Sequence, residues 1–194
     1  MTDLKANLLD CAARHSSLVI TGFMGTGKTS VGRKVAQKLG REFVDMDEVI
    51  ERHEGKTVRA IFEMRGEAYF RARESELCAE LAARDNLVIV TGGGTLVNRH
   101  NRALFANAWI VCLDASVDAI VARLDDSKDR PLLAGGELRG QVERLLRARR
   151  EAYAQIEHHV DTTNKSVAEV ADEILAALEG SNGTPADAGE SGER

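Results

Sequence analysis

The sequence has no hydrophobic run long enough to cross a membrane, and it is poor in cysteine, proline and aromatic residues. Of its 194 residues, 3 are cysteine, 2 are proline and 4% are aromatic. No apolar stretch approaches the roughly 20 residues that a transmembrane helix needs. Residues 1–16 are polar and interrupted by acids, which is not the pattern of a secretory signal. We therefore expect a cytoplasmic protein that does not enter a membrane.

The sequence also lacks the cysteine and histidine spacing of a disulfide framework or a metal cluster, and it lacks an excess of basic residues. Cys11, Cys78 and Cys112 are too few and too scattered for a disulfide framework or a metal cluster, so we expect reduced thiols. Four histidines lack ligand spacing relative to a cysteine or a carboxylate: His53, His100, His158 and His159. The formal net charge is −5, whereas nucleic-acid-binding proteins usually have a basic excess. We therefore expect no nucleic-acid partner.

What the sequence does contain is a regular alternation of short apolar strands and longer amphipathic helices. Strands are predicted at 18–22, 42–45, 87–90, 109–113 and 158–162. Helices are predicted at 29–39, 47–53, 58–64, 67–84, 98–105, 117–124, 138–156 and 167–178. This alternation favours right-handed βαβ units and an α/β fold with a parallel sheet covered on both faces. Ligands of such sheets bind beyond the carboxyl ends of the strands, so functional residues should follow the strands.

The two ends of the chain differ from its middle. Residues 179–194 are mostly Gly, Ser, Asp and Glu with no large apolar residue, which predicts a disordered tail. Residues 1–16 are interpreted as an N-terminal extension. Between them, residues 17–178 are long enough for one domain with a substantial core.

The strongest motif follows the first predicted strand. Residues 22–29 read Gly-Phe-Met-Gly-Thr-Gly-Lys-Thr, which matches the P-loop pattern G-x-x-x-x-G-K-[ST] between a strand and a helix. Its glycines let backbone N–H groups surround phosphate oxygens, and the helix that follows adds its N-terminal dipole. The predicted contacts to ATP are Gly25, Thr26, Gly27, Lys28, Thr29 and Ser30. Switches, motors, small-molecule kinases and nucleotide kinases share this loop, so it leaves the reaction open.

Within this motif, two side chains have distinct predicted roles. Lys28 should reach the β- and γ-phosphates, and the Thr29 hydroxyl should ligate Mg²⁺. An acidic pair follows the second predicted strand, as Asp45 and Asp47. If the chain stays extended there, both carboxylates point into the same crevice, where one supports the metal and the other meets an acceptor hydroxyl. The alternative is a solvated acidic turn in which Asp47 caps the next helix.

Three further features carry weaker signals. Gly92, Gly93 and Gly94 follow the third strand and permit close backbone approach by a ligand, although a plain turn also explains them. Arg71 and Glu74 are neighbours on one helix face, and taken alone they indicate a surface ion pair. The flexible segment 129–136 places an arginine between two helices. It could close over a triphosphate, or it could be a mobile surface loop.

Together these stretches resemble the shikimate kinase family, from about residue 18 to residue 178. The matching stretches are the P-loop at 22–29, Phe-Val-Asp-Met-Asp at 43–47, Gly-Glu-x-x-Phe-Arg-x-x-Glu at 66–74, Gly-Gly-Gly at 92–94, Arg-Pro-Leu-Leu at 130–133 and Arg-x-x-x-Tyr at 149–153. The P-loop alone is widely shared, but the ordered set is specific. Thr29 stands where serine is common, and either hydroxyl can ligate Mg²⁺.

The resemblance implies transfer of the γ-phosphoryl group of ATP to the 3-hydroxyl of shikimate, in aromatic amino-acid biosynthesis. It implies that Asp47, Arg71 and Arg149 bind shikimate. The backbone of the three glycines at 92–94 would line the same pocket. An arginine matches this substrate chemically, because its planar guanidinium fits a carboxylate.

The resemblance also implies catalytic and nucleotide-binding roles. Asp47 would contact the acceptor hydroxyl and take its proton, and Asp45 would hold Mg²⁺ through water. Lys28 and Arg130 would stabilise the charge on the transferred phosphoryl group. Arg130 would reach ATP from a lid, and Arg123 would stack on adenine.

The family fold implied by the resemblance is a three-layer α/β/α arrangement around a five-stranded parallel sheet of order 2-3-1-4-5. A substrate-binding helical insertion would span about 47–83 and a lid about 125–137. The expected state is a monomer. Two alternatives stay open: a nucleotide or sugar-acid kinase of the same architecture, and a P-loop regulator that binds ATP without catalysis. The second is disfavoured by an intact set of transfer residues: Lys28, Thr29, Asp45, Asp47 and Arg130.

Overall fold

The fold is built on a five-stranded sheet, described in a computed structural model for residues 17–124 and 137–181. The strands are β1 (Leu18–Gly22), β2 (Glu42–Asp45), β3 (Leu87–Val90), β4 (Trp109–Asp114) and β5 (His158–Asp161). All neighbouring pairs are parallel, and the order is β2-β3-β1-β4-β5. This confirms the predicted sheet.

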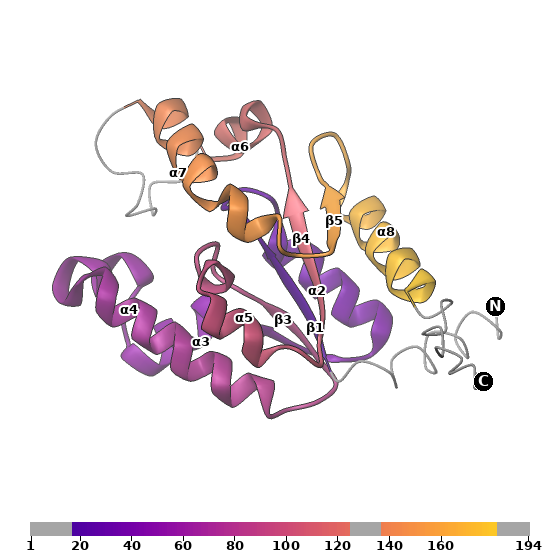
Figure 1. The fold of residues 1–194 in the computed structure, drawn as a ribbon, viewed down its shortest axis with the longest axis horizontal. Coiled ribbons are helices and arrows are strands. Elements are labelled where there is room, and N and C mark those ends of the chain that lie inside the picture. The colour runs from indigo at the N-terminus through magenta and orange to yellow at the C-terminus, as the bar shows by residue number, and fades with distance from the viewer. Residues whose placement is uncertain (1–16, 125–136, 182–194) are drawn as a thin grey trace, which may run out of the picture.

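Helices cover both faces of the sheet (Figure 1). They are α2 (Lys28–Leu39), α3 (Met46–Glu54), α4 (Val58–Ala82), α5 (Arg99–Leu104), α6 (Val117–Leu124), α7 (Leu138–Tyr153) and α8 (Val167–Gly180), with a 3₁₀ turn η1 (Thr95–Val97). α2 and α8 pack together against one face, and the other helices lie on the opposite side. The result is the expected three-layer arrangement. No helix in the described ranges is both long and apolar enough to span a membrane.

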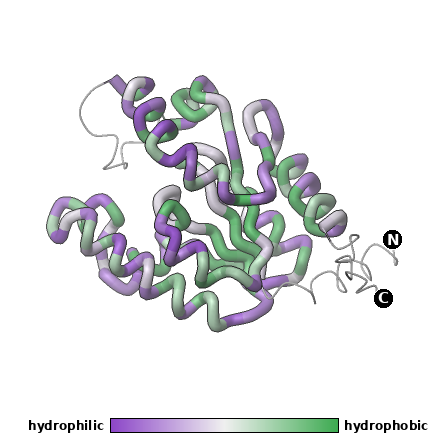
Figure 2. The backbone as a smooth tube through the Cα atoms, viewed as in Figure 1, coloured by the Kyte–Doolittle hydropathy of each residue, from purple (hydrophilic) through white to green (hydrophobic). Residues whose placement is uncertain are grey.

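The core lies on the two faces of the sheet because alternate strand residues point to opposite sides. Leu18 and Ile20 face α2 and α8, whereas Val19 between them faces α4 and α5. All three are fully buried, as expected for a parallel strand covered on both faces. Figure 2 shows the same pattern, with hydrophobic residues along the central strands and a mixture of hydrophobic and hydrophilic residues along the helices.

The ends of two helices differ from the predicted ends, whereas a predicted break is found. The interruption expected at Gly66 is confirmed, since this residue breaks α4 with φ 81° and ψ 169°. The helix α7 ends at Tyr153, three residues before the predicted end at Ile156. The helix α8 continues to Gly180, so Glu179 and Gly180 are helical. The predicted lid at 125–137, apart from Glu137, and the N-terminal extension lie outside the described residues, as does the tail from 182 onward.

The helix α2 contacts the sheet closely through Gly32. A Cβ added to Gly32 would lie 2.5 Å from Val90 Cγ2 and 3.0 Å from Phe43 Cε2. Both neighbours belong to the packed interior, so the helix would have to move outward. We expect Gly32→Ala to lower the free energy of unfolding by about 1–3 kcal/mol and Tm by roughly 2–12 °C.

A thermal unfolding experiment checks this expectation against a matched variant. Gly180→Ala makes the same change at the end of α8, where an added Cβ meets nothing within 4 Å. Its Tm should stay within about 2 °C of the parent protein. Equal Tm values for Gly32→Ala and Gly180→Ala would contradict the close packing of α2.

Candidate active site

A cavity of about 660 Å³ lies beyond the carboxyl ends of β1, β2 and β3. This is the place where a parallel α/β sheet binds ligands. Most of the residues singled out from the sequence line it: Gly25, Gly27, Lys28, Thr29, Ser30, Asp45, Asp47, Arg71, Gly92, Gly93, Gly94, Arg123 and Arg149. Thr26 does not, because its buried hydroxyl donates to the carbonyl of Phe23. Arg130 lies outside the described residues.

The P-loop occupies one end of the cavity and depends on backbone shapes that favour glycine. Gly25 and Gly27 have φ angles of 80° and 85°, and Gly27 is the N-cap of α2. Gly22 has φ 136°, and a Cβ there would lie 2.3 Å from the carbonyl oxygen of Leu113. Lys28 lines the cavity, and its Nζ donates to the carbonyl of Phe23 at 2.9 Å. The loop therefore presents a cation and a helix N-terminus on one side.

The side-chain oxygens of Thr29 on α2 and Asp45 at the end of β2 meet beside the P-loop. The Thr29 hydroxyl donates to Asp45 Oδ2 at 2.8 Å. The other oxygen, Asp45 Oδ1, accepts from the backbone N–H groups of Asp47 and Glu48 at 3.0 and 3.4 Å. Hydroxyl and carboxylate oxygens are the ligands that Mg²⁺ prefers, so this pair fits the metal that accompanies a nucleoside triphosphate.

The same contacts correct the expected geometry of the acidic pair. The chain does not stay extended after Asp45, because α3 begins at Met46 with Asp45 as its N-cap. Asp45, and not Asp47, therefore caps the helix. Asp47 lies in the first turn of α3 and still lines the cavity. Its carboxylate is close to the glycine loop, because a Cβ added at Gly92 would be 3.0 Å from Asp47 Oδ1. Both carboxylates reach one cavity through the first turn of a helix.

Arg71 is held by two carboxylates of its own helix. Its Nη1 donates to Glu74 Oε2 at 2.5 Å, and its Nη2 donates to Glu67 Oε1 at 2.9 Å. The side chain of Glu74 is only 1% exposed, and its Oε1 accepts from the hydroxyl of Thr95. The interpretation of Arg71 and Glu74 as a surface ion pair is therefore wrong.

The electrostatics of this group keep the guanidinium charged. Burial acts to lower the pKa of Arg71, but the negative charges and hydrogen bonds of Glu74 and Glu67 raise it above its ordinary value. A partly buried, fixed cation at the cavity wall suits an anionic group on a small ligand. Glu74 thus determines where that cation stands.

A second arginine approaches the cavity from the opposite side, on α7. Arg149 is buried, and its Nη1 donates to the carbonyl of Gly93 at 3.1 Å. One turn later, the Tyr153 hydroxyl donates to the same carbonyl at 2.6 Å. The arginines of α4 and α7 therefore both stand beside the three-glycine loop.

Arg123 joins the P-loop to the segment that follows β5. Its Nη1 donates to the carbonyl of Gly25 at 3.1 Å, and its Nη2 donates to the carbonyl of Thr162 at 2.6 Å. The side chain also lines the cavity. These hydrogen bonds use the edge of the guanidinium and not its planar face.

Sequence reasoning missed several residues that shape the cavity. An apolar part of the wall comes from Val58, Phe62 and Phe70 on α4. Thr95 and Tyr153 received no role and Glu74 received only that of a surface ion-pair partner, although each holds a lining group in place. The signal was present for Glu74 and Tyr153, which belong to the matched stretches at 66–74 and 149–153.

One further group of polar residues gathers at β4 and β5. Donor atoms of Cys112, Asp114 and His159 lie within 4.8 Å of one another, which the spacing in sequence did not predict. Pairing of the two strands places Cys112 opposite His159. The His159 ring contacts Asp114 Oδ2 at 2.6 Å and the carbonyl of Ile156 at 3.1 Å. Each ring nitrogen of His159 therefore has one oxygen within hydrogen-bond distance.

The fold and the site together define a class. One cavity joins a P-loop at the start of α2, a hydroxyl and a carboxylate for a metal, and a region lined by Asp47, Arg71 and Arg149. These are the parts of a P-loop kinase that acts on a small molecule.

Comparison with known proteins then identifies the family. The family model for shikimate kinase matches residues 24–179. Shikimate kinase of Pelotomaculum thermopropionicum is 43% identical over 167 residues, which cover 86% of this chain and 97% of the relative. The shikimate kinase of Geobacter metallireducens is 39% identical over 165 residues, covering 84% and 92%. The chain belongs to the shikimate kinase family.

Solved structures agree with this assignment. Shikimate kinase from Acinetobacter baumannii, solved in complex with shikimate, has a TM-score of 0.84 at 34% identity and covers 88% of this chain and 96% of that one. A gluconokinase from Sinorhizobium meliloti has a TM-score of 0.55 at 20% identity, covering 85% and 92%, and shares the fold alone.

Proposed function

We propose that this protein transfers the γ-phosphoryl group of ATP to the 3-hydroxyl of shikimate, releasing ADP and shikimate 3-phosphate. The observation that carries the proposal is the set of residues that line one cavity. This cavity joins the P-loop to a region lined by Asp47, Arg71 and Arg149. Membership of the shikimate kinase family supports the choice of substrate.

The carboxylate of shikimate is bound by Arg71 and Arg149, which approach from α4 and α7. Each guanidinium offers paired N–H donors that match a carboxylate. The carbon ring of the substrate packs on the apolar wall made by Phe62 and Phe70, whose ring centroids are 5.0 Å apart. The backbone of Gly92 to Gly94 lines the pocket, and its lack of side chains lets Asp47, Glu74 and Arg71 approach it closely.

Phosphoryl transfer requires a nucleophile, a path for its proton and compensation of charge. Asp47 orients the 3-hydroxyl and accepts its proton as the oxygen bonds to the γ-phosphorus. The bond from the γ-phosphorus to the bridging oxygen breaks, and ADP leaves with that oxygen. Lys28 stabilises the negative charge on the phosphoryl oxygens. Arg130 adds a second cation, by analogy with the family.

Thr29 and Asp45 would hold the Mg²⁺ ion that accompanies ATP, the hydroxyl directly and the carboxylate through water. Their oxygens are 2.8 Å apart beside the P-loop, and Asp45 is fixed there by its hydrogen bonds to the start of α3. When bound, the ion neutralises phosphate charge. Arg123 stacks its planar face on adenine. The enzyme works as a cytoplasmic monomer, without a nucleic-acid or membrane partner.

Gly94→Ala tests the placement of the carboxylate-binding pocket. A Cβ at Gly94 would lie 2.6–2.8 Å from the guanidinium atoms at the end of the Arg71 side chain, so the guanidinium must leave its position while the fold survives. We expect kcat/KM for shikimate to fall about 10- to 100-fold, with KM for ATP within twofold.

Gly140→Ala is the matched control, because it adds the same methyl group on α7 where nothing lies within 4 Å. Steady-state kinetics of both variants decide the matter. If Gly94→Ala keeps the parental KM for shikimate, Arg71 does not bind the substrate in the position described.

The function itself is tested by coupled detection of ADP. Purified protein with Mg²⁺ and ATP should form ADP when shikimate is added, and not with gluconate or AMP. Turnover of gluconate or AMP without turnover of shikimate would replace the assignment with a sister kinase. ATP binding without turnover of any of the three would indicate a P-loop regulator.

A further inference from the structure

The three carbonyl groups of the glycine loop are satisfied in two different ways. Those of Gly92 and Gly94 accept from the backbone N–H groups of Thr95 and Val97, both at 3.2 Å, within the turn that leads into η1. The carbonyl of Gly93 is held from another element. It accepts from Arg149 Nη1 and from the Tyr153 hydroxyl, both on α7. The middle of the loop is therefore anchored by α7.

This anchor matters because the loop has no side chains to hold it. A peptide unit is planar, so fixing the direction of the Gly93 carbonyl also fixes the direction of the Gly94 N–H, which points the opposite way. Within residues 17–124 and 137–181, no hydrogen bond is donated by the backbone N–H groups of Gly92 to Gly94. Glycine backbone left alone samples many conformations, and a substrate pocket needs one.

Arg149 is a poor sole anchor, since its guanidinium also has to bind the carboxylate of the substrate. Tyr153 has no such second task. It is 7% exposed and packs in a cluster with Phe23 and Ile156. It lies four residues after Arg149, so both side chains leave the same face of α7.

The protonation state of Tyr153 suits a permanent donor. Burial raises the pKa of Tyr153 to about 12, and the nearby charge of Arg149 acts in the opposite direction. The hydroxyl therefore keeps its proton throughout the neutral range. Its contact with the Gly93 carbonyl, at 2.6 Å, is the shorter of the two that reach this oxygen.

We propose that Tyr153 is a positioning residue for the acceptor substrate: it holds the Gly93 carbonyl, sets the orientation of the glycine loop, and leaves Arg149 available to the substrate carboxylate. This inference rests on the proposed function, because it assigns the loop to the shikimate pocket. Tyr153 does not touch the reacting atoms. It acts through the backbone of residues 92–94.

Tyr153→Phe tests the proposal, because it removes the hydroxyl and keeps the packed ring. We expect kcat/KM for shikimate to fall about 5- to 30-fold, mainly through a higher KM. KM for ATP should stay within twofold, because the Tyr153 hydroxyl donates to the glycine loop and the ring that packs on Phe23 of the P-loop is kept. The split between the two KM values separates positioning from a general loss of structure.

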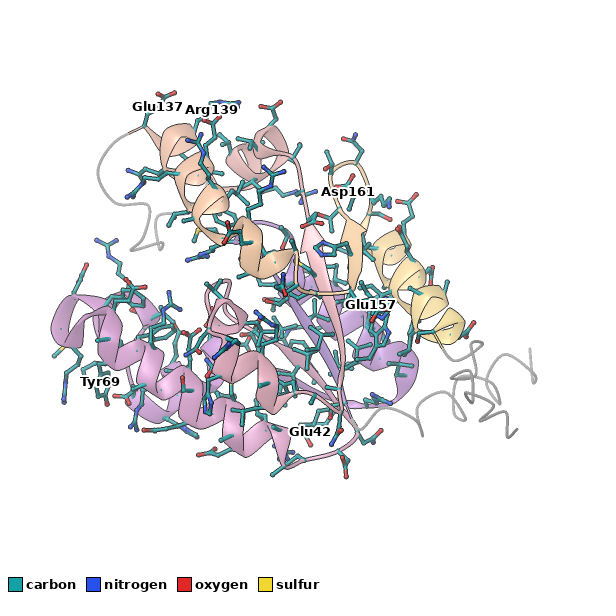
Figure 3. The ribbon with its side chains drawn as sticks, viewed as in Figure 1. Glu42, Tyr69, Glu137, Arg139, Glu157 and Asp161 are labelled. Carbon is teal, nitrogen blue, oxygen red and sulfur yellow. The ribbon has the colours of Figure 1, made fainter. Side chains whose placement is uncertain are left out.

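Tyr69→Phe is the matched control, the same change at the other tyrosine of the chain. The Tyr69 hydroxyl donates to Glu54 Oε1 at 2.9 Å, and the side chain projects from α4 at the periphery of the molecule (Figure 3). Its kinetic constants for shikimate and ATP should both stay within twofold of the parent protein. A binding titration of Tyr153→Phe with shikimate, at a temperature where circular dichroism shows full folding, gives a second readout and should show a weaker Kd.

The outcomes are distinct. Unchanged KM and Kd for shikimate in Tyr153→Phe would overturn the proposal. Equal losses for shikimate and ATP, with a lower Tm, would also overturn it, because they indicate a structural role only. Failure of the parent protein to phosphorylate shikimate is a separate result, and it would refute the proposed function before any variant is compared.

Discussion

Asp47→Asn should lower kcat for shikimate phosphorylation by about 100- to 10,000-fold, the range of an acid–base contribution. Asparagine has nearly the same shape as aspartate, but it cannot accept the proton of the acceptor hydroxyl. The backbone N–H of residue 47, which donates to Asp45, is kept, so α3 should begin as before. Binding of ATP, measured by calorimetry, should change less than twofold.

The control for this experiment is Asp172→Asn, the same exchange on α8. Asp172 is exposed and pairs with Lys38, away from the cavity. It should keep kcat within twofold, because exposed ion pairs contribute little. A kcat for Asp47→Asn within tenfold of the parent value would remove Asp47 from the proton path.

Lys28→Met should lower kcat/KM by about 100- to 1000-fold, which is the typical cost of losing one preorganised group that stabilises the transition state. Methionine keeps an unbranched apolar side chain, one atom shorter, and removes the ammonium of a residue that lines the cavity. The substitution removes the hydrogen bond from Lys28 Nζ to the Phe23 carbonyl, but it leaves in place the glycines that shape the P-loop at positive φ, Gly25 and Gly27. Steady-state kinetics with ATP and shikimate both varied measure the loss.

Lys34→Met serves as its control on the same helix. Lys34 contacts Gln37 at 3.4 Å and does not line the cavity. It should retain kcat/KM within twofold, while Tm of both variants stays close to that of the parent. Comparable losses in the two variants would mean that the effect arises from α2 as a whole and not from the cation in the P-loop.

The features that sequence could predict are those that depend on local pattern. Parallel strands covered on both faces are continuous apolar runs, so β1, β3 and β4 were found at nearly their true bounds. The P-loop is contiguous, and its glycines adopt the positive φ angles that the motif requires. The break at Gly66 followed from the same property of glycine.

The features that sequence could not predict depend on depth and on distant contacts. Spacing on a helix showed that Arg71 and Glu74 are neighbours, but it could not show that Glu74 is buried against Thr95 from another element. Tyr153 meets Gly93 across 60 positions of the chain. Asp45 is the N-cap of α3 because its side chain accepts hydrogen bonds from two backbone N–H groups of that helix. The pattern of apolar residues does not show which of the two aspartates caps the helix.

Phosphorus-31 NMR of the reaction product tests the central claim most directly. Protein incubated with Mg²⁺, ATP and shikimate should yield one new phosphate monoester signal, coupled to the proton on carbon 3 of shikimate, in amounts equal to the ADP formed. The assignment of Asp47, Arg71 and Arg149 to one acceptor pocket requires that single position. A phosphoryl group on the 4- or 5-hydroxyl, or ADP released with inorganic phosphate and no ester, would contradict it.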